Sequence, residues 1–341
     1  MKKIKVAING AGRIGRAFYK LAREREEIEV IAINDLGDID NIAYLLKFDT
    51  VYGKSKFNIE VKENNLVIDG KKIKFISEKD PSNLPWKELN IDVVIESTGF
   101  FTNYHGAKAH IDAGAKRVVV TAPMKDEPTD IAGATVLMGV NEEKLSTCLV
   151  TSNASCTTNA GSPLIAILDE TLGIEKALLN TTHGYTASQS LVDGPSKKSF
   201  REGRAAAQNI VPSSTGAAIA VTKAFTKLEG LFDGISMRVP VPAGSIVDVT
   251  FISKKNTTAE EVNGILKEAA KNKRWAGIFT VTEEELVSSD ILGSTYGSIA
   301  DLSFTRVVGG NLVKVLAWYD NEVGYCHTLL NHVIKFGAHI K

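Results

Sequence analysis

Residues 9–15 read NGAGRIG, and this stretch decides the fold of the N-terminal half of the chain. An apolar run at 5–8 precedes it, and apolar residues at helical spacing follow it in 13–25. A strand, a glycine-rich turn and a helix in this order are typical of a dinucleotide-binding unit. Glycine lets the backbone approach a pyrophosphate, and the helix N-terminus offers unpaired N–H groups with partial positive charge. The pattern predicts a nucleotide-binding loop formed by Gly10, Gly12 and Gly15.

An acidic residue ends the next strand-like run, 29–35. Asp35 lies 20 residues after Gly15 (35 − 15 = 20), which is the spacing expected for the residue that binds the ribose. Its carboxylate can accept hydrogen bonds from the adenosine ribose and would repel a 2′-phosphate, so we expect NAD rather than NADP. The alternative is a tight strand-to-helix turn that binds no ligand.

Further apolar, β-branched runs at 92–99 and 117–123 flank a helix-like stretch at 106–115. Buried strands that alternate with helices predict a Rossmann-type, doubly wound parallel sheet. The second half differs, because long strand-like segments follow one another with few helices between them. We therefore expect an α/β fold with a second, α+β catalytic domain on a mainly antiparallel sheet. A capping box at Thr257 and Glu260 predicts one helix in that half.

The length of 341 residues suits two domains. We place an NAD-binding domain at 1–155 and a catalytic domain at 156–320, and we expect a helix from about 321 to 341 to join the first domain. Because 40 basic residues balance 40 acidic ones, we expect neither a dedicated nucleic-acid partner nor attraction to an anionic membrane. No apolar run in the sequence approaches the length of a membrane span.

The chain contains three cysteines, Cys148, Cys156 and Cys326. An odd number of widely spaced cysteines does not predict a disulfide framework, and no cluster of Cys and His has the spacing of a zinc site. We therefore expect a soluble, cytoplasmic protein without a metal centre.

Cys156 lies in the polar run SNASCTTN, at 152–159, and opens a helix-like stretch. A thiol at a helix N-terminus is expected to have a lowered pKa. His183 ends another strand-like segment 27 residues later (183 − 156 = 27), so tertiary structure would have to bring the two together. Packing or a surface position is the commoner role for an isolated cysteine or histidine, and we interpret the other five histidines in this way. In a chain that binds NAD, a thiolate with a nearby base suggests aldehyde oxidation.

Several segments, in order along nearly the whole chain, resemble the family of phosphorylating glyceraldehyde-3-phosphate dehydrogenases. They include INGAGRIGR, ESTGFF, SNASCTTN, HGYTASQ, AAQNIVPSSTGAA, MRVPVP and WYDNEVGY. The resemblance implies that Cys156 attacks the aldehyde of glyceraldehyde 3-phosphate and that His183 activates the thiol. It also implies that hydride passes to NAD and that inorganic phosphate releases the resulting thioester as an acyl phosphate.

The resemblance implies further site residues and a homotetramer. For the phosphate of the substrate they are Thr186 and Arg238. For the attacking phosphate they are Ser155, Thr157, Thr215 and Gly216. For the cofactor, beside the glycines and Asp35, they are Arg13, Ile14, Lys79, Thr121 and Asn321.

The chain departs from the family pattern at Ala11, Lys79, Ala160, Glu202 and Val323. Other activities also stay open: an erythrose-4-phosphate or non-phosphorylating aldehyde dehydrogenase of the same fold, and a thiol hydrolase. The erythrose-4-phosphate enzyme lacks the Tyr-Thr and Thr-Gly pairs that this chain keeps at 185–186 and 215–216. RNA binding through the cofactor groove is a further alternative, which the balanced charge does not support.

Overall fold

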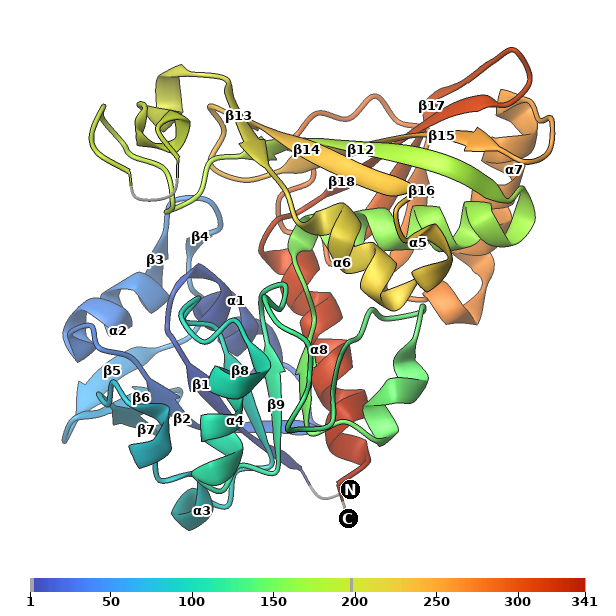
Figure 1. Ribbon diagram of the computed structural model, residues 1–341. Helices are drawn as coiled ribbons and strands as arrows, with labels where there is room; N and C mark the ends of the chain where they lie inside the picture. Colours follow the sequence, from blue (N-terminus) through green and yellow to red (C-terminus); the bar gives the residue numbers. More distant parts are fainter. Residues whose placement is uncertain (1–2, 197–198, 341) are drawn as a thin grey trace. The chain divides into compact units, whose positions relative to one another are not determined.

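The computed structural model describes residues 3–196 and 199–340 (Figure 1). Its internal contacts group the chain into two compact units. The first unit comprises Met1–Val136, Glu142–Ala154 and Leu329–Lys341. The second unit comprises Leu137–Asn141 and Ser155–Thr328.

The first unit is built on a nine-stranded sheet in the order β10-β11-β9-β8-β1-β2-β7-β6-β5. Its strands are β1 (Ile4–Asn9), β2 (Ile28–Asn34), β5 (Ile59–Lys62), β6 (Asn65–Ile68), β7 (Lys71–Ile76), β8 (Val93–Glu96), β9 (Arg117–Val120), β10 (Gly133–Thr135) and β11 (Val150–Ser152). All neighbours from β10 to β7 are parallel, and β6 and β5 extend one edge with antiparallel pairs. The strand order reverses at β1, between β2 and β8. Ligands of such sheets bind outside the carboxyl ends of the strands at this point.

Helices pack on both faces of this sheet. They are α1 (Arg13–Ala22), α2 (Ile39–Lys47), α3 (Trp86–Leu89), α4 (Tyr104–Asp112) and the part of α8 (Val323–Ala338) that belongs to this unit. On one face, Ala7 and Val94 pack against Tyr104 of α4. On the other, α1 lies so close to β1 that a Cβ on Gly15 would be 3.1 Å from the Ile8 side chain. The predicted doubly wound fold is confirmed.

The second unit is built on a seven-stranded sheet in the order β13-β14-β12-β15-β18-β17-β16. Its strands are β12 (Ile174–Gly184), β13 (Val211–Ser214), β14 (Phe232–Val239), β15 (Ser245–Ser253), β16 (Phe279–Thr282), β17 (Ser298–Val308) and β18 (Leu312–Tyr319). Only the pairs β12–β14 and β16–β17 are parallel, and the other neighbours are antiparallel. The prediction of a mainly antiparallel second sheet is therefore confirmed.

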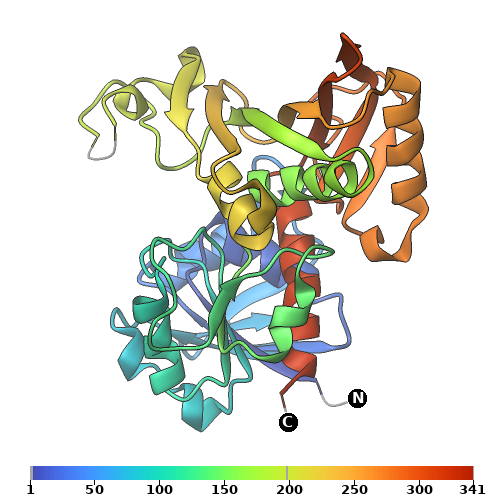
Figure 2. The same cartoon turned by 45° about the vertical axis from the view of Figure 1, so that its right-hand side comes forward.

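One face of the second sheet is covered by α5 (Cys156–Thr171), α6 (Ala217–Ala224) and α7 (Ala259–Lys271). Both views show α5 and α6 on the same side of the sheet (Figures 1 and 2). Leu179 and Val249 point into this core, and alternation along the strands sends Leu178 to the other face, where it is exposed. The predicted capping box of α7 is wrong by one residue, because the Thr258 side chain accepts the N–H of Glu261.

Of the helices that the structure describes, none is long and apolar enough to cross a membrane. Within the same residues, no group of His, Cys, Asp and Glu side chains has a metal-binding arrangement.

Candidate functional site

The glycine loop links the end of β1 to the first turn of α1. Gly10 has φ +98°, and a Cβ there would lie 2.7 Å from the backbone nitrogen of Thr98. A Cβ on Gly15 would lie 2.0 Å from the Gly10 carbonyl oxygen. Gly12 differs, because a Cβ there would meet no atom within 4 Å. Sterics therefore require two of the three glycines, whereas Gly12 borders open space.

The N-terminus of α1 carries positive partial charge, and no acidic residue lies in its first turn. Gly12 is the N-cap, and no side chain makes a capping hydrogen bond. Helix N-termini without an acidic cap bind anions through the N–H groups of their first turn. The loop thus fits the diphosphate of a dinucleotide.

Asp35 follows β2 and is tied to this loop. Its Oδ2 accepts the N–H of Ala11 at 2.6 Å, and its Oδ1 accepts the N–H of Gly37 at 2.8 Å. Each carboxylate oxygen can accept a second hydrogen bond, so the group can still bind the hydroxyls of a ribose.

The other predicted cofactor residues of the first unit lie in different surroundings. Arg13 pairs with Asp49 at 2.8 Å, and Ile14 is half-buried on α1. Thr121 follows β9 and donates both its N–H and its hydroxyl to the carbonyl of Glu96, at 3.0 and 3.1 Å. Lys79 is exposed.

In the second unit, Cys156 and His183 lie side by side, although 27 residues (183 − 156) separate them. Cys156 is the first residue of α5, and the Ser155 side chain caps this helix by accepting the N–H of Thr158 at 3.1 Å. His183 lies near the end of β12, and its Nε2 is 3.4 Å from Cys156 Sγ. A thiol and a base at this distance form a candidate nucleophile pair.

The surroundings of His183 orient its ring. The Gly184 carbonyl lies 2.6 Å from Nδ1, and in the tautomer that donates the Nδ1 proton to this carbonyl, Nε2 is an acceptor that faces the thiol. Asn321 Nδ2 approaches the same Nε2 to 3.2 Å. Arg238 is the partner of His183 across the parallel β12–β14 pair, and its Nη1 lies 2.6 Å from Nδ1. A base, a guanidinium and an amide thus surround the thiol.

Burial controls the protonation of this pair. It lowers the pKa of His183 to about 3, and the charge of Arg238 acts in the same direction. Burial raises the pKa of the Cys156 thiol, against the opposite influence of Arg238 and Asn321. The lowered thiol pKa expected from the helix N-terminus is therefore wrong, because desolvation of the thiolate dominates. Burial thus disfavours both the thiolate and the imidazolium.

The residues predicted to bind phosphate do not all lie close to Cys156 and His183. Thr157 is buried and its hydroxyl lies 2.8 Å from that of Tyr319. Thr186 is exposed, with its hydroxyl 3.1 Å from that of Ser188. Gly216 caps α6 without a side-chain bond, directly after Thr215. Among the described residues, no hydrogen bond joins Thr186, Thr215 or Gly216 to the group around Cys156.

The pairing of strands explains this dispersion. Val211 of β13 lies opposite Arg238 of β14, and the antiparallel register carries the chain away from Arg238 as far as Ser214, which lies opposite Ile235. Thr215 is four residues beyond Val211, or roughly 13 Å along the strand direction. Two separate anion-binding positions are compatible with this spacing.

Two further side chains that lie in the group around Cys156 and His183 were not predicted from the sequence. Ser245 Oγ accepts the N–H of Gly184 at 3.1 Å and Asn321 Nδ2 at 2.6 Å. The ring of Tyr319 meets that of His183 edge-on at 6.1 Å. The only signal for Tyr319 is its place two residues before Asn321, and Ser245 gives no signal of its own.

Two of the residues that depart from the family pattern are buried. Ala160 is buried in the α5 core, and its carbonyl accepts the Ser298 hydroxyl at 2.8 Å. Glu202 is buried and accepts the Ser213 hydroxyl at 2.9 Å. Arg204 pairs with Asp193 at 2.8 Å, so this surface ion pair holds one of the two arginines that flank Glu202.

Comparison with known proteins gives matches over nearly the whole chain. Residues 4–104 match the model of the glyceraldehyde 3-phosphate dehydrogenase NAD binding domain, and residues 155–321 match that of the C-terminal domain. A glyceraldehyde-3-phosphate dehydrogenase of Streptomyces coelicolor is 46% identical over 337 residues, covering 98% of each chain. The protein of that name from Buchnera aphidicola is 48% identical over 331 residues, with 97% of this chain and 98% of its own covered. The protein of that name from Eremothecium gossypii is 47% identical over 336 residues, with 98% of this chain and 99% of its own covered.

Proposed function

The chain belongs to the glyceraldehyde-3-phosphate dehydrogenase family of NAD-dependent oxidoreductases, and we propose that it oxidises D-glyceraldehyde 3-phosphate to 1,3-bisphosphoglycerate through a thioester on Cys156. The observation that carries this proposal is the 3.4 Å contact between Cys156 Sγ and His183 Nε2. The Gly184 carbonyl, 2.6 Å from Nδ1, supports it, because the tautomer that donates Nδ1–H to this carbonyl can accept a proton at Nε2.

Cys156 Sγ attacks the aldehyde carbon, and Nε2 of His183 accepts the thiol proton as the C–S bond forms. His183 then passes this proton from Nε2 to the carbonyl oxygen, which gives a hemithioacetal and returns the imidazole to its neutral form. NAD, when bound, supplies the acceptor for the hydride that leaves this carbon. His183 removes the hydroxyl proton in that step, and a thioester remains on Cys156. A phosphate oxygen then attacks the thioester carbon, and the sulfur leaves as a thiolate.

NAD is assigned to the first unit, with Asn321 of the second as a further cofactor residue. The uncapped N-terminus of α1 and the open space at Gly12 fit a diphosphate, and the remaining hydrogen-bonding capacity of Asp35 fits a ribose. The full set of cofactor residues is Gly10, Gly12, Arg13, Ile14, Gly15, Asp35, Lys79, Thr121 and Asn321.

Two sites are assigned to phosphate groups. Arg238 and Thr186 bind the phosphate of the substrate, and the position of Arg238 beside His183 supports this role. The attacking phosphate binds Ser155, Thr157, Thr215 and Gly216, where two helix N-termini offer N–H groups. Because the Thr157 hydroxyl faces Tyr319, we assign its contribution to the backbone N–H.

The protein is proposed to act as a homotetramer in the cytoplasm, with domains at 1–155 plus about 321–341, and at 156–320. Apolar side chains on the open face of the second sheet support association between copies, and they include Leu178, Ile235 and Leu312. None of the three cysteines forms a disulfide in the part of the chain that the structure describes, which suits a reducing compartment.

The test is NADH absorbance with purified protein, glyceraldehyde 3-phosphate and NAD, with and without inorganic phosphate. We expect sustained turnover only with phosphate, and a single burst of NADH without it. Steady turnover that ignores phosphate would mean that water resolves the thioester, as in a non-phosphorylating enzyme. If no NADH forms under either condition, the proposed function is wrong.

A further inference from the structure

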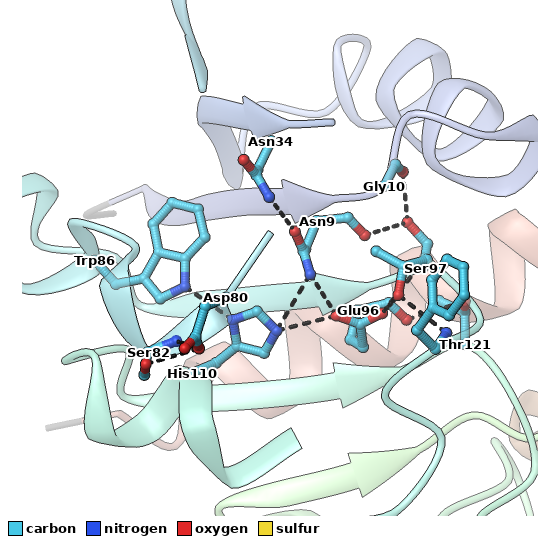
Figure 3. Close-up of polar contacts among 12 residues, drawn as sticks. Asn9, Gly10, Asn34, Asp80, Ser82, Trp86, Glu96, Ser97, His110 and Thr121 are labelled. Carbon is cyan, nitrogen blue, oxygen red and sulfur yellow. Dashed lines mark hydrogen bonds and ion pairs between the residues drawn. The ribbon is translucent and has the colours of Figure 1, made fainter. Parts of the chain in front are cut away.

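We infer that Glu96 is a positioning residue for the cofactor, and that its buried carboxylate joins the loops of the dinucleotide site into one preformed surface. The inference rests on the proposed binding of NAD to the first unit. Figure 3 shows how Asn9 of β1 and His110 of α4 converge on Glu96, the last residue of β8.

The Glu96 carboxylate is 1% exposed, and four hydrogen-bond donors meet its two oxygens. Oε2 accepts Asn9 Nδ2 at 2.6 Å and His110 Nε2 at 3.0 Å. Oε1 accepts the N–H of Thr98 at 2.9 Å and also its hydroxyl. A buried carboxylate is tolerated when it is paired in this way.

The direction of these bonds is fixed from both ends of the network. Asn34 donates to Asn9 Oδ1 at 2.6 Å, so the Asn9 amide must turn its NH₂ group toward Glu96. The Trp86 indole donates to His110 Nδ1 at 3.0 Å, which places the His110 proton on Nε2, toward Glu96. Neither Asn9 nor His110 can reverse without breaking a second buried hydrogen bond.

Each loop assigned to NAD is attached to this network. Asn9 directly precedes Gly10, and Asn34 directly precedes Asp35. Thr121 donates twice to the Glu96 carbonyl. The Ser97 hydroxyl lies 2.7 Å from the carbonyl of Gly10, which fixes the turn below α1.

Two further hydrogen bonds connect the network to the segment that follows β7. The Asn34 side chain donates to the carbonyl of Glu78 and accepts its N–H, both at 2.9 Å, and Glu78 directly precedes Lys79. The diphosphate loop, the ribose acid and the segments after β7 and β9 thus share one hydrogen-bonded support. Preorganisation of this kind increases affinity, because binding then orders fewer groups.

The decisive variant is Glu96→Gln, which keeps the shape of the side chain but replaces one acceptor oxygen with an NH₂ group. Asn9 and His110 cannot turn an acceptor toward this group without breaking a second hydrogen bond. We expect the dissociation constant for NAD, measured by calorimetry, to rise about tenfold or more, as follows when a buried donor loses its acceptor. KM for NAD should rise with it, whereas kcat at saturating NAD should change little. The rate of Cys156 alkylation without NAD should be that of the wild type, because that thiol lies in the second unit.

Asp92→Asn is the matched control. Asp92 is also a buried carboxylate, it directly precedes β8, and it accepts the N–H of Lys5 and the Lys116 ammonium group. It lies at the end of the sheet away from the glycine loop, so its substitution should lower the melting temperature and leave NAD affinity unchanged. Trp86→Phe combined with Glu96→Gln should regain part of the affinity, since His110 is then able to turn its acceptor toward the amide.

If Glu96→Gln does not fold, His110→Leu and His110→Gln make the same comparison. Leucine removes a donor to Glu96 and should weaken NAD binding, whereas glutamine can still donate to Glu96 and should retain it. An unchanged NAD dissociation constant in Glu96→Gln, or equal affinities in the two His110 variants, would overturn the inference. Wild-type protein that binds no NAD would instead overturn the proposed function.

Discussion

The glycine loop of the first unit is formed by one short segment, whereas the group around Cys156 takes its side chains from four separate segments. In the loop, backbone geometry carries the function, because Gly10 and Gly15 have no room for a Cβ. In the catalytic group, the start of α5 supplies the thiol, and β12, β14 and the segment after β18 supply His183, Arg238 and Asn321. Changes to the backbone of the loop should therefore reduce stability or NAD binding, and single side-chain changes around Cys156 should reduce turnover.

The largest effect is expected at Cys156. In Cys156→Ser the hydroxyl is a much poorer nucleophile than a thiol and cannot form the thioester, so kcat should fall on the order of 10⁴-fold or more, as for other nucleophile replacements. The NAD dissociation constant should stay within about twofold, since the cofactor loops are unchanged. The measurements are NADH formation with glyceraldehyde 3-phosphate and NAD titration by calorimetry. Near-normal turnover would show that Cys156 is not the nucleophile.

Gly10→Ala and Gly12→Ala test two different roles of glycine in the loop: a backbone conformation that has no room for a Cβ, and open space for the diphosphate. Gly10→Ala places a Cβ against the Thr98 backbone at φ +98°, which should lower the free energy of unfolding by about 1–3 kcal/mol. Gly12→Ala meets no protein atom, so it should leave the stability nearly unchanged and weaken NAD binding by filling the space assigned to the diphosphate. Urea unfolding and NAD titration of both variants make the comparison. Equal losses of stability would contradict it.

The nucleotide loop could be predicted from the sequence because its determinants are local. The spacing of Gly10, Gly12 and Gly15 between a strand and a helix, with Asp35 after the next strand, sufficed for the fold of the first unit and its ligand class. The second sheet was predictable because long strand-like segments, two of which form β12 and β15, follow one another with few helices between them. The helix start near Thr257 was predicted one residue early, because two adjacent threonines offer equivalent caps.

The catalytic group could not be derived in the same way. The contact between Cys156 and His183 depends on the β12 register, and that of His183 with Arg238 depends on the β12–β14 pairing, neither of which has a local signal. The raised thiol pKa could not be predicted, because burial arises only from tertiary packing. The interpretation of the remaining histidines as surface or structural could not reveal that His110 is buried against Glu96.

A smaller effect is expected at the ribose position. Asp35→Ala removes the carboxylate assigned to the adenosine ribose, so NAD affinity should fall about tenfold, the cost of one or two charge-assisted hydrogen bonds. NADP affinity should fall less or improve, because the repulsion of a 2′-phosphate disappears at the same time. Fluorescence titration with both nucleotides measures the ratio. A ratio equal to that of the wild type would mean that Asp35 does not discriminate between them.

The smallest effect is a shift in pH dependence at Arg238. Its positive charge stabilises the Cys156 thiolate and lowers the pKa of that thiol, against the larger and opposite influence of burial. Arg238→Gln removes this contribution, so the folded-state thiol pKa should rise and the pH midpoint of alkylation by iodoacetamide should move to higher pH. The measurement is made without substrate or NAD, so that loss of substrate phosphate binding does not contribute. A midpoint that stays in place or moves to lower pH would show that the guanidinium does not face the thiol in solution, and that the register of β12 and β14 does not control this part of the site.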